Sequence, residues 1–157
     1  MAGVAAFSLC ACGALAHTAA GAQPASAARP AAATPTPPAS HLVITGVVNG
    51  TVQRATAAGQ CGPATSGGLG GELRFQLQER PWALALSLPS YRAPGTYQLP
   101  PGRVSLHTLG IGPSAQFFGS QRGSVSVAAD GVSGTLDADL AGDAGTVHVG
   151  GAWSCLG

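Results

Sequence analysis

The strongest constraint on the fold of this chain is a period-two alternation of apolar and polar side chains. It appears in five stretches: residues 72–78, 82–88, 124–127, 135–140 and 146–153. Successive side chains of a β-strand point to opposite faces, so each stretch predicts a strand with one buried face. Seven to nine such strands, separated by glycine- and proline-rich turn signals, predict an all-β fold, a single antiparallel β-sandwich or small barrel.

The chain divides by composition into three parts: residues 1–21, residues 22–40 and residues 41–157. The first part starts with an apolar run, Met1 to Ala16, that is shorter than the ~20 residues of a membrane-spanning helix and is typical of an export signal. The second part is an Ala/Pro/Thr-rich linker, whose prolines favour extended polyproline II structure. The third part is the predicted β-domain.

The end of the signal is open to two interpretations. Ala14-Leu15-Ala16 fits the pattern of a signal-peptide cleavage site. Leu9-Cys10-Ala11-Cys12 is similar to the lipobox of bacterial lipoproteins, in which the last cysteine is acylated, although Cys10 departs from that pattern. The protein is therefore expected outside the cytoplasm, either secreted or anchored to the membrane by a lipid on Cys12, with no other membrane contact.

Two of the four cysteines, Cys61 and Cys155, lie in the β-domain. Exported proteins meet an oxidising environment, so this pair predicts one disulfide. A zinc site is not predicted, because the domain has no CxxC motif and no histidines at zinc-finger spacing.

The charge of the chain limits its partners. Charged residues make up 8% of the sequence and the net charge is +1, with no basic cluster that would bind phosphate backbones. We therefore expect no nucleic-acid partner and no cofactor, and an envelope or extracellular ligand of unknown identity. The sequence contains neither a GxSxG nor an HExxH motif, so no catalytic residue is predicted.

Turn positions predict the register of the last three strands. A two-residue turn at Asp130-Gly131 places Ser124 opposite Asp137. A two-residue turn at Gly142-Asp143 places Asp137 opposite His148, and this register keeps the apolar residues of both strands on one face.

The resulting row of Ser124, Asp137 and His148 does not have the order of a hydrolytic triad, which needs the histidine in the middle. We interpret the row as polar cross-strand pairs on a solvated face. Asp137, Asp139 and His148 are weak metal-ligand candidates only, since alternate residues of a strand lie ~7 Å apart. No metal site is predicted.

The aromatic residues are the remaining candidates for ligand binding. Trp153 shares the parity of the apolar residues of its strand and is expected in the core. Trp82, Tyr91, Tyr97 and Phe117 lie at strand ends or turns, and are the ligand-binding candidates.

The stretch LVITGVVNGTVQR, residues 42–54, is open to two interpretations. It forms either one long strand with a glycine bulge, which we favour, or a hairpin that turns at Asn49-Gly50.

Several short stretches resemble small uncharacterised bacterial cell-envelope proteins, many of them lipoproteins. The stretches are YRAPGTY (91–97), GSVSV (123–127), Asp130-Gly131, GTLDADL (134–140), VHV (147–149) and WSC (153–155). The resemblance implies export and a β-domain with a cysteine near each end, and it implies no activity.

The expected function is therefore a non-catalytic binding or scaffolding role for an exported, envelope-tethered β-domain. The alternative is a carbohydrate or small-ligand binding module that uses the loop aromatics, and a hydrolase is a distant third.

Overall fold

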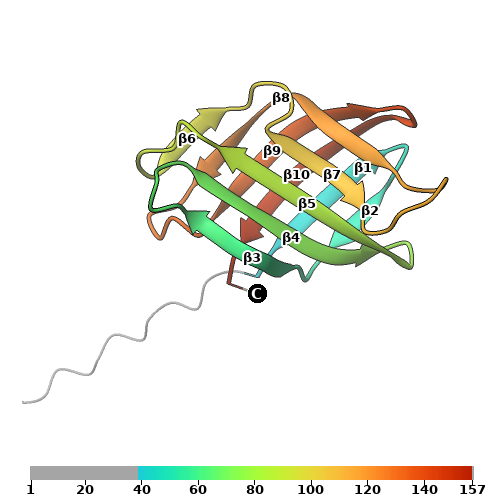
Figure 1. Cartoon of the computed structure of the whole chain (residues 1–157), viewed down its shortest axis with the longest axis horizontal. Coiled ribbons are helices and arrows are strands. Elements are labelled where there is room, and N and C mark those ends of the chain that lie inside the picture. The colour runs from blue at the N-terminus through green and yellow to red at the C-terminus, as the bar shows by residue number, and fades with distance from the viewer. Residues whose placement is uncertain (1–38, 157) are drawn as a thin grey trace, which may run out of the picture. The chain divides into compact units, whose positions relative to one another are not determined.

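The computed structural model describes residues 39–156, and this part of the chain contains ten strands and no helix (Figure 1). The strands are β1 (His41–Gly46), β2 (Gly50–Val52), β3 (Thr56–Pro63), β4 (Leu69–Leu77), β5 (Arg80–Leu88), β6 (Gly95–Gln98), β7 (Val104–Thr108), β8 (Phe117–Val127), β9 (Ser133–Gly142) and β10 (Gly145–Ser154). Residues 39–156 thus offer no helix that could span a membrane. The signal, Cys12 and the linker up to residue 38 lie outside the described residues.

All strand pairs are antiparallel, and they form one curled sheet, a half-barrel. Nine strands follow one path in the order β2-β1-β10-β9-β8-β7-β5-β4-β3, and the short β6 pairs with one end of β8. Figure 1 shows the curl: β3, β4 and β5 pass in front of β1, β10 and β9. The curl brings the β4–β5 turn to the β1–β2 turn, where Gln78 Nε2 donates a hydrogen bond to the Asn49 carbonyl at 2.9 Å. The predicted all-β, antiparallel class is confirmed.

The core lies inside the curl and follows the predicted alternation. Buried side chains on the last two strands are Leu136, Ala138 and Leu140 from β9 and Val147, Val149 and Trp153 from β10. Phe118 and Leu106, from β8 and β7, are fully buried on the next two strands of the sheet. Complete burial of an apolar side chain of this size stabilises the fold by about 1.5–3 kcal/mol.

The predicted register is right for one strand pair and wrong for the other. Ser124 lies opposite Asp137 between β8 and β9, as predicted. The predicted two-residue turn at Asp130-Gly131 is wrong, however: residues 128–132 join the two strands, and the Gly131 amide donates a hydrogen bond to the Ala128 carbonyl at 3.0 Å. Between β9 and β10, however, His148 lies opposite Asp139, and Asp137 lies opposite Gly150.

The difference comes from the turn between β9 and β10. Gly142 pairs with Gly145, so the two turn residues are Asp143 and Ala144, and the pairing is two residues away from the predicted one. A shift of two residues leaves every side chain on its predicted face, so side-chain parity alone does not exclude it.

The start of the domain is a hairpin, so the favoured interpretation of one long strand is wrong. β2 folds back along β1, with Leu42 opposite Val52 and Ile44 opposite Gly50. The turn spans residues 47–49, and its Val48 side chain is buried. Burial of the apolar Val48 side chain in the core stabilises this turn.

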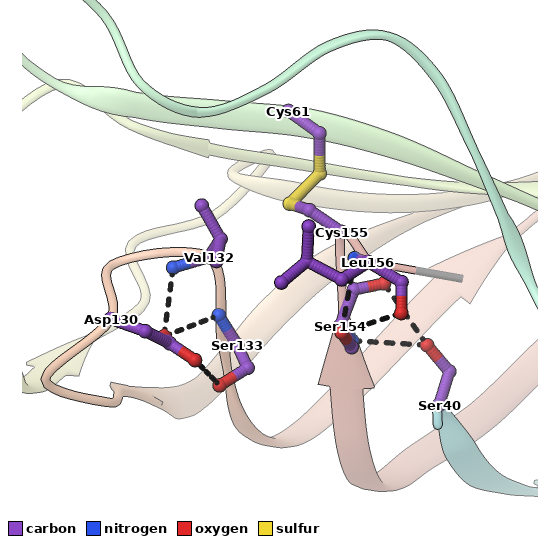
Figure 2. The surroundings of a disulfide bond; sticks show 8 residues. All are labelled: Ser40, Cys61, Asp130, Val132, Ser133, Ser154, Cys155 and Leu156. Carbon is purple, nitrogen blue, oxygen red and sulfur yellow. Dashed lines mark hydrogen bonds between the residues drawn. A yellow bond between two sulfur atoms is a disulfide. The ribbon is translucent and has the colours of Figure 1, made fainter. Parts of the chain in front are cut away.

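The predicted disulfide is confirmed. The sulfur atoms of Cys61 and Cys155 lie 1.99 Å apart and the Cα atoms 5.6 Å apart, which links β3 to the residue after β10 (Figure 2). Gly71 on β4 faces this bond, and a Cβ at that position would overlap the Cys61 sulfur. The disulfide therefore ties one end strand of the sheet path to the C-terminal strand.

A buried serine pair closes the fold beside the disulfide (Figure 2). The Ser40 hydroxyl accepts a hydrogen bond from the Ser154 amide at 3.0 Å and donates one to the Ser154 carbonyl at 3.2 Å. Ser40 is the last residue of the segment interpreted as linker, yet it is buried and belongs to the folded domain.

Candidate functional site

Large side chains fill the interior of the curled sheet. Trp82 packs against Phe118, with ring centroids 6.4 Å apart. An internal cavity beside Trp153 and Leu136 measures only about 20 Å³, room for about one water molecule and far below the ~300 Å³ of a small ligand pocket. A ligand of this domain is therefore expected on its surface.

Three of the four aromatic candidates serve the structure rather than the surface. Trp82 and Tyr91 are only 2% and 8% exposed, so neither offers a ring face to a ligand. The half-buried Tyr97 packs against Tyr91, and its hydroxyl accepts hydrogen bonds from the backbone amides of Arg92 and Ala93. The large apolar area of these rings stabilises the core and the turn between β5 and β6.

Phe117 is the candidate that lies on the surface, with 63% of the residue exposed. Its ring stacks on His107 with a centroid distance of 6.2 Å, and it lines a pocket of about 460 Å³ together with Arg80. Phe117 begins β8, whereas Tyr97 pairs with Val125 near the other end of that strand. The structure therefore does not bring the four aromatic candidates together.

A row of charged side chains crosses the outer face of β8, β9 and β10. The Asp139 carboxylate accepts a hydrogen bond from Arg122 Nε at 2.7 Å and lies 2.9 Å from His148 Nδ1. His148 Nε2 lies 4.0 Å from Asp137. Sequence reasoning missed Arg122, although the predicted β8–β9 register, extended by one further outward-facing pair, places it opposite Asp139.

These contacts determine what the row can do. The hydrogen bond with His148, followed by the one with Arg122, lowers the pKa of Asp139 below its usual value, so this carboxyl is ionised over the physiological range. The guanidinium beside it opposes a metal cation, and residues 39–156 contain no group of three or more His, Cys, Asp or Glu side chains that could hold a metal ion. The weak metal candidates Asp137, Asp139 and His148 thus form an ion-pair row on the surface.

A second surface feature lies between β2 and β4, where the curled sheet meets itself. We call it the arginine groove. It measures about 780 Å³ and is lined by Thr51, Val52, Gln53, Arg54, Thr56, Arg74, Phe75, Gln76, Pro81 and Leu109. Its volume is in the range of small-ligand sites, and hydroxyl, amide and guanidinium groups make up much of its lining.

The two arginines of the groove differ in their partners. Arg74 lies opposite Thr56, and its Nε donates a hydrogen bond to Glu72 at 2.7 Å. Among the described residues, Arg54 has no carboxylate within 4.0 Å. Arg54 is also exposed, so its five N–H donors are open to an anionic ligand.

Charge is segregated along the described chain. Residues 53–116 carry five arginines and two glutamates, a net charge of +3. Residues 117–156 carry one arginine and four aspartates, a net charge of −3. The nearly neutral net charge of the whole chain therefore conceals a basic half, which includes the groove arginines, and an acidic half, which includes the ion-pair row.

No family model matches this chain, and neither the curated proteins nor the solved structures contain a significant match. The function of the protein is therefore inferred from its own geometry.

Proposed function

We propose that this protein is an exported, envelope-tethered domain that binds an extracytoplasmic ligand, without catalysis, through the arginine groove. One observation carries the proposal: the groove offers about 780 Å³ lined by hydrogen-bonding side chains, while the curled sheet has a packed interior. A domain of this kind recognises its ligand at the surface, through polar contacts.

The export part of the proposal is supported by the pair of cysteines at bonding distance. Disulfides of this kind persist in oxidising compartments outside the cytoplasm. The apolar segment before the domain then serves as the signal, with Cys12 as the lipid attachment site and residues 22–38 as the tether.

The ion-pair row supports the non-catalytic part of the proposal. The two oxygens of Asp139 are bonded to Arg122 and His148, which is the arrangement of a surface ion-pair network. Ser124 lies opposite Asp137 rather than beside a histidine, so the row lacks the serine–histidine contact of a nucleophilic site.

The test is co-sedimentation of the purified mature protein with isolated cell envelopes of the producing organism. The variant is Arg54→Gln/Arg74→Gln, and the matched control is Arg103→Gln/Arg122→Gln, which removes the same charge outside the groove. We expect the wild type and the control to be retained alike, and the groove variant to lose about tenfold or more in affinity, as for the loss of a charged hydrogen bond.

Equal retention of the groove variant and the wild type would refute the proposal, provided that thermal unfolding shows both to be folded. Localisation is tested separately by Cys12→Ala, which should move the protein from the membrane to the soluble extracytoplasmic fraction.

A further inference from the structure

The arginine groove does not end at the seam of the sheet. It shares Pro81 and Leu109 with a neighbouring pocket of about 230 Å³, which follows the loop after β7. That pocket in turn shares Arg80, Ser114 and Ala115 with the pocket of about 460 Å³ beside Phe117. Three adjacent hollows that share lining residues thus follow one another along this end of the domain, and we call them together the trough.

An extended trough fits an extended ligand. A compact small molecule would occupy one of the three hollows, whereas a linear chain can run from Arg54 past Pro81 to Phe117. The hydrogen bond from the Leu109 amide to the Pro81 carbonyl, at 2.8 Å, holds the wall that the first two hollows share.

The charges along the trough select the sign of the ligand. Arg54, Arg74 and Arg80 line it, against a single carboxylate, that of Asp143 at the Phe117 end. Within the described residues neither Arg54 nor Arg80 has a carboxylate within 4.0 Å. All seven basic residues of the chain are arginines and none is a lysine. The planar guanidinium binds carboxylate and phosphate in a bidentate way, which an ammonium group cannot do.

The other lining groups select the kind of chain. Thr51, Gln53 and Gln76 supply hydroxyls and amides, which both donate and accept hydrogen bonds and so suit the hydroxyl groups of a sugar. At the far end, the exposed Phe117 ring offers a flat apolar face for the C–H face of a sugar ring. A membrane surface would instead require its cations on a convex or flat face, and here they line a concave one.

We propose that the ligand of this trough is an acidic polysaccharide, whose carboxylate or phosphate groups pair with Arg54, Arg74 and Arg80. This inference depends on the proposed function, because it names the ligand of the same groove. The polymer runs along the trough and places one sugar ring against Phe117.

The experiment measures the affinity of the purified mature protein for three polysaccharides: alginate, which carries carboxylates, a phosphomannan, which carries phosphates, and neutral dextran. We expect alginate or the phosphomannan to bind at least about tenfold more tightly than dextran, and the stronger of the two identifies the anionic group. Binding should weaken steadily as NaCl is raised from about 0.05 to 0.5 M, because screening reduces the attraction between the charges.

Variants locate the binding. We expect the affinity for the acidic polymer to fall by about tenfold or more in Arg54→Gln and in Arg80→Gln. It should fall by about three- to tenfold in Phe117→Ala. In the control Arg103→Gln the affinity should stay within about twofold of the wild type. Affinity for the acidic polymer that is unchanged in Arg54→Gln and Arg80→Gln would overturn the inference.

The remaining outcomes separate this inference from the proposed function. If the protein binds dextran as tightly as alginate and phosphomannan, the ligand is not selected by charge and the inference fails, while a groove-dependent retention on envelopes still stands. Binding to none of the three polymers, with groove-dependent retention on envelopes, likewise overturns only the inference. If envelope retention does not depend on Arg54 and Arg74, the proposed function itself fails.

Discussion

The disulfide offers the clearest quantitative test of how this fold is stabilised. The perturbation is Cys61→Ala/Cys155→Ala, which removes the bond that joins β3 to the residue after β10. The two cysteines are 94 residues apart in the sequence, so the bond closes most of the domain into one loop and restricts the unfolded chain strongly.

The magnitude follows from the entropy of loop closure. For a separation of 94 residues, the chain-entropy model gives about 4.7 kcal/mol at 25 °C, and measured values often fall below the model. We therefore expect the variant to lose about 2–5 kcal/mol, a large share of the ~5–15 kcal/mol that stabilises a typical domain. The midpoint of thermal unfolding should fall by roughly 8–20 °C.

The assay is equilibrium unfolding in urea, followed by tryptophan fluorescence, because Trp82 and Trp153 are both buried in the folded state. The wild type under reducing conditions is the matched control, since it loses the bond but keeps both sulfur atoms. The difference between the reduced wild type and the alanine variant measures the packing of the thiols, for example of Cys61 against Gly71.

Two results would contradict this reasoning. Two free thiols in the unreduced, unfolded mature protein would show that the bond does not form. A loss of less than ~1 kcal/mol in both the variant and the reduced wild type would show that loop closure does not stabilise this chain.

Three further predictions concern single positions. Ser120→Ala should lower the free energy of unfolding in urea by about 2–4 kcal/mol, because the buried hydroxyl accepts hydrogen bonds from two backbone N–H groups. The control Ser124→Ala, on the outer face, should change this free energy by less than ~0.5 kcal/mol. Gly134→Ala should lower the free energy of unfolding by at least about 2 kcal/mol, because a Cβ there would overlap a carbonyl oxygen of β8. The measurement is the midpoint of thermal unfolding, and an unchanged midpoint would refute that packing. The folded pKa of Asp139 is lowered, so its contribution to stability is present above the unfolded value of 3.8 and is lost as the pH falls through the folded pKa. Asp139→Asn should therefore be slightly less stable than the wild type at pH 7. The difference should shrink as the pH falls below 3.8, and a difference that does not change with pH would contradict the ion-pair interpretation.

Local pattern was sufficient to predict much of the fold. The alternation in residues 135–140 predicts that Leu136 and Leu140 face the core and that Asp137 faces solvent, and the structure agrees. The predicted β8–β9 register is right, although the two-residue turn from which it was predicted is not formed and the strands are joined through residues 128–132. The disulfide followed from elimination, since the β-domain has only two cysteines.

The candidate site was much less accessible from the sequence. Parity determines a register only to within two residues, so the pattern could not distinguish Asp137 from Asp139 as the partner of His148. Trp82 and Tyr91 lie near turns, and their burial depends on which strands pack over them. The hairpin of residues 41–52 depends on the burial of Val48, which is also a tertiary effect.

The sequence by itself determined which face of each strand is apolar, the antiparallel class and the pairing of the cysteines, because those properties depend on neighbours in the chain or on elimination. Only the tertiary structure decided that Arg54, Arg74 and Leu109 share one groove. These residues belong to distant segments, and the curl of a nine-strand path brings β2 to β4. That curl is the sum of many small strand twists and side-chain contacts around the whole sheet, so no short stretch of sequence contains it.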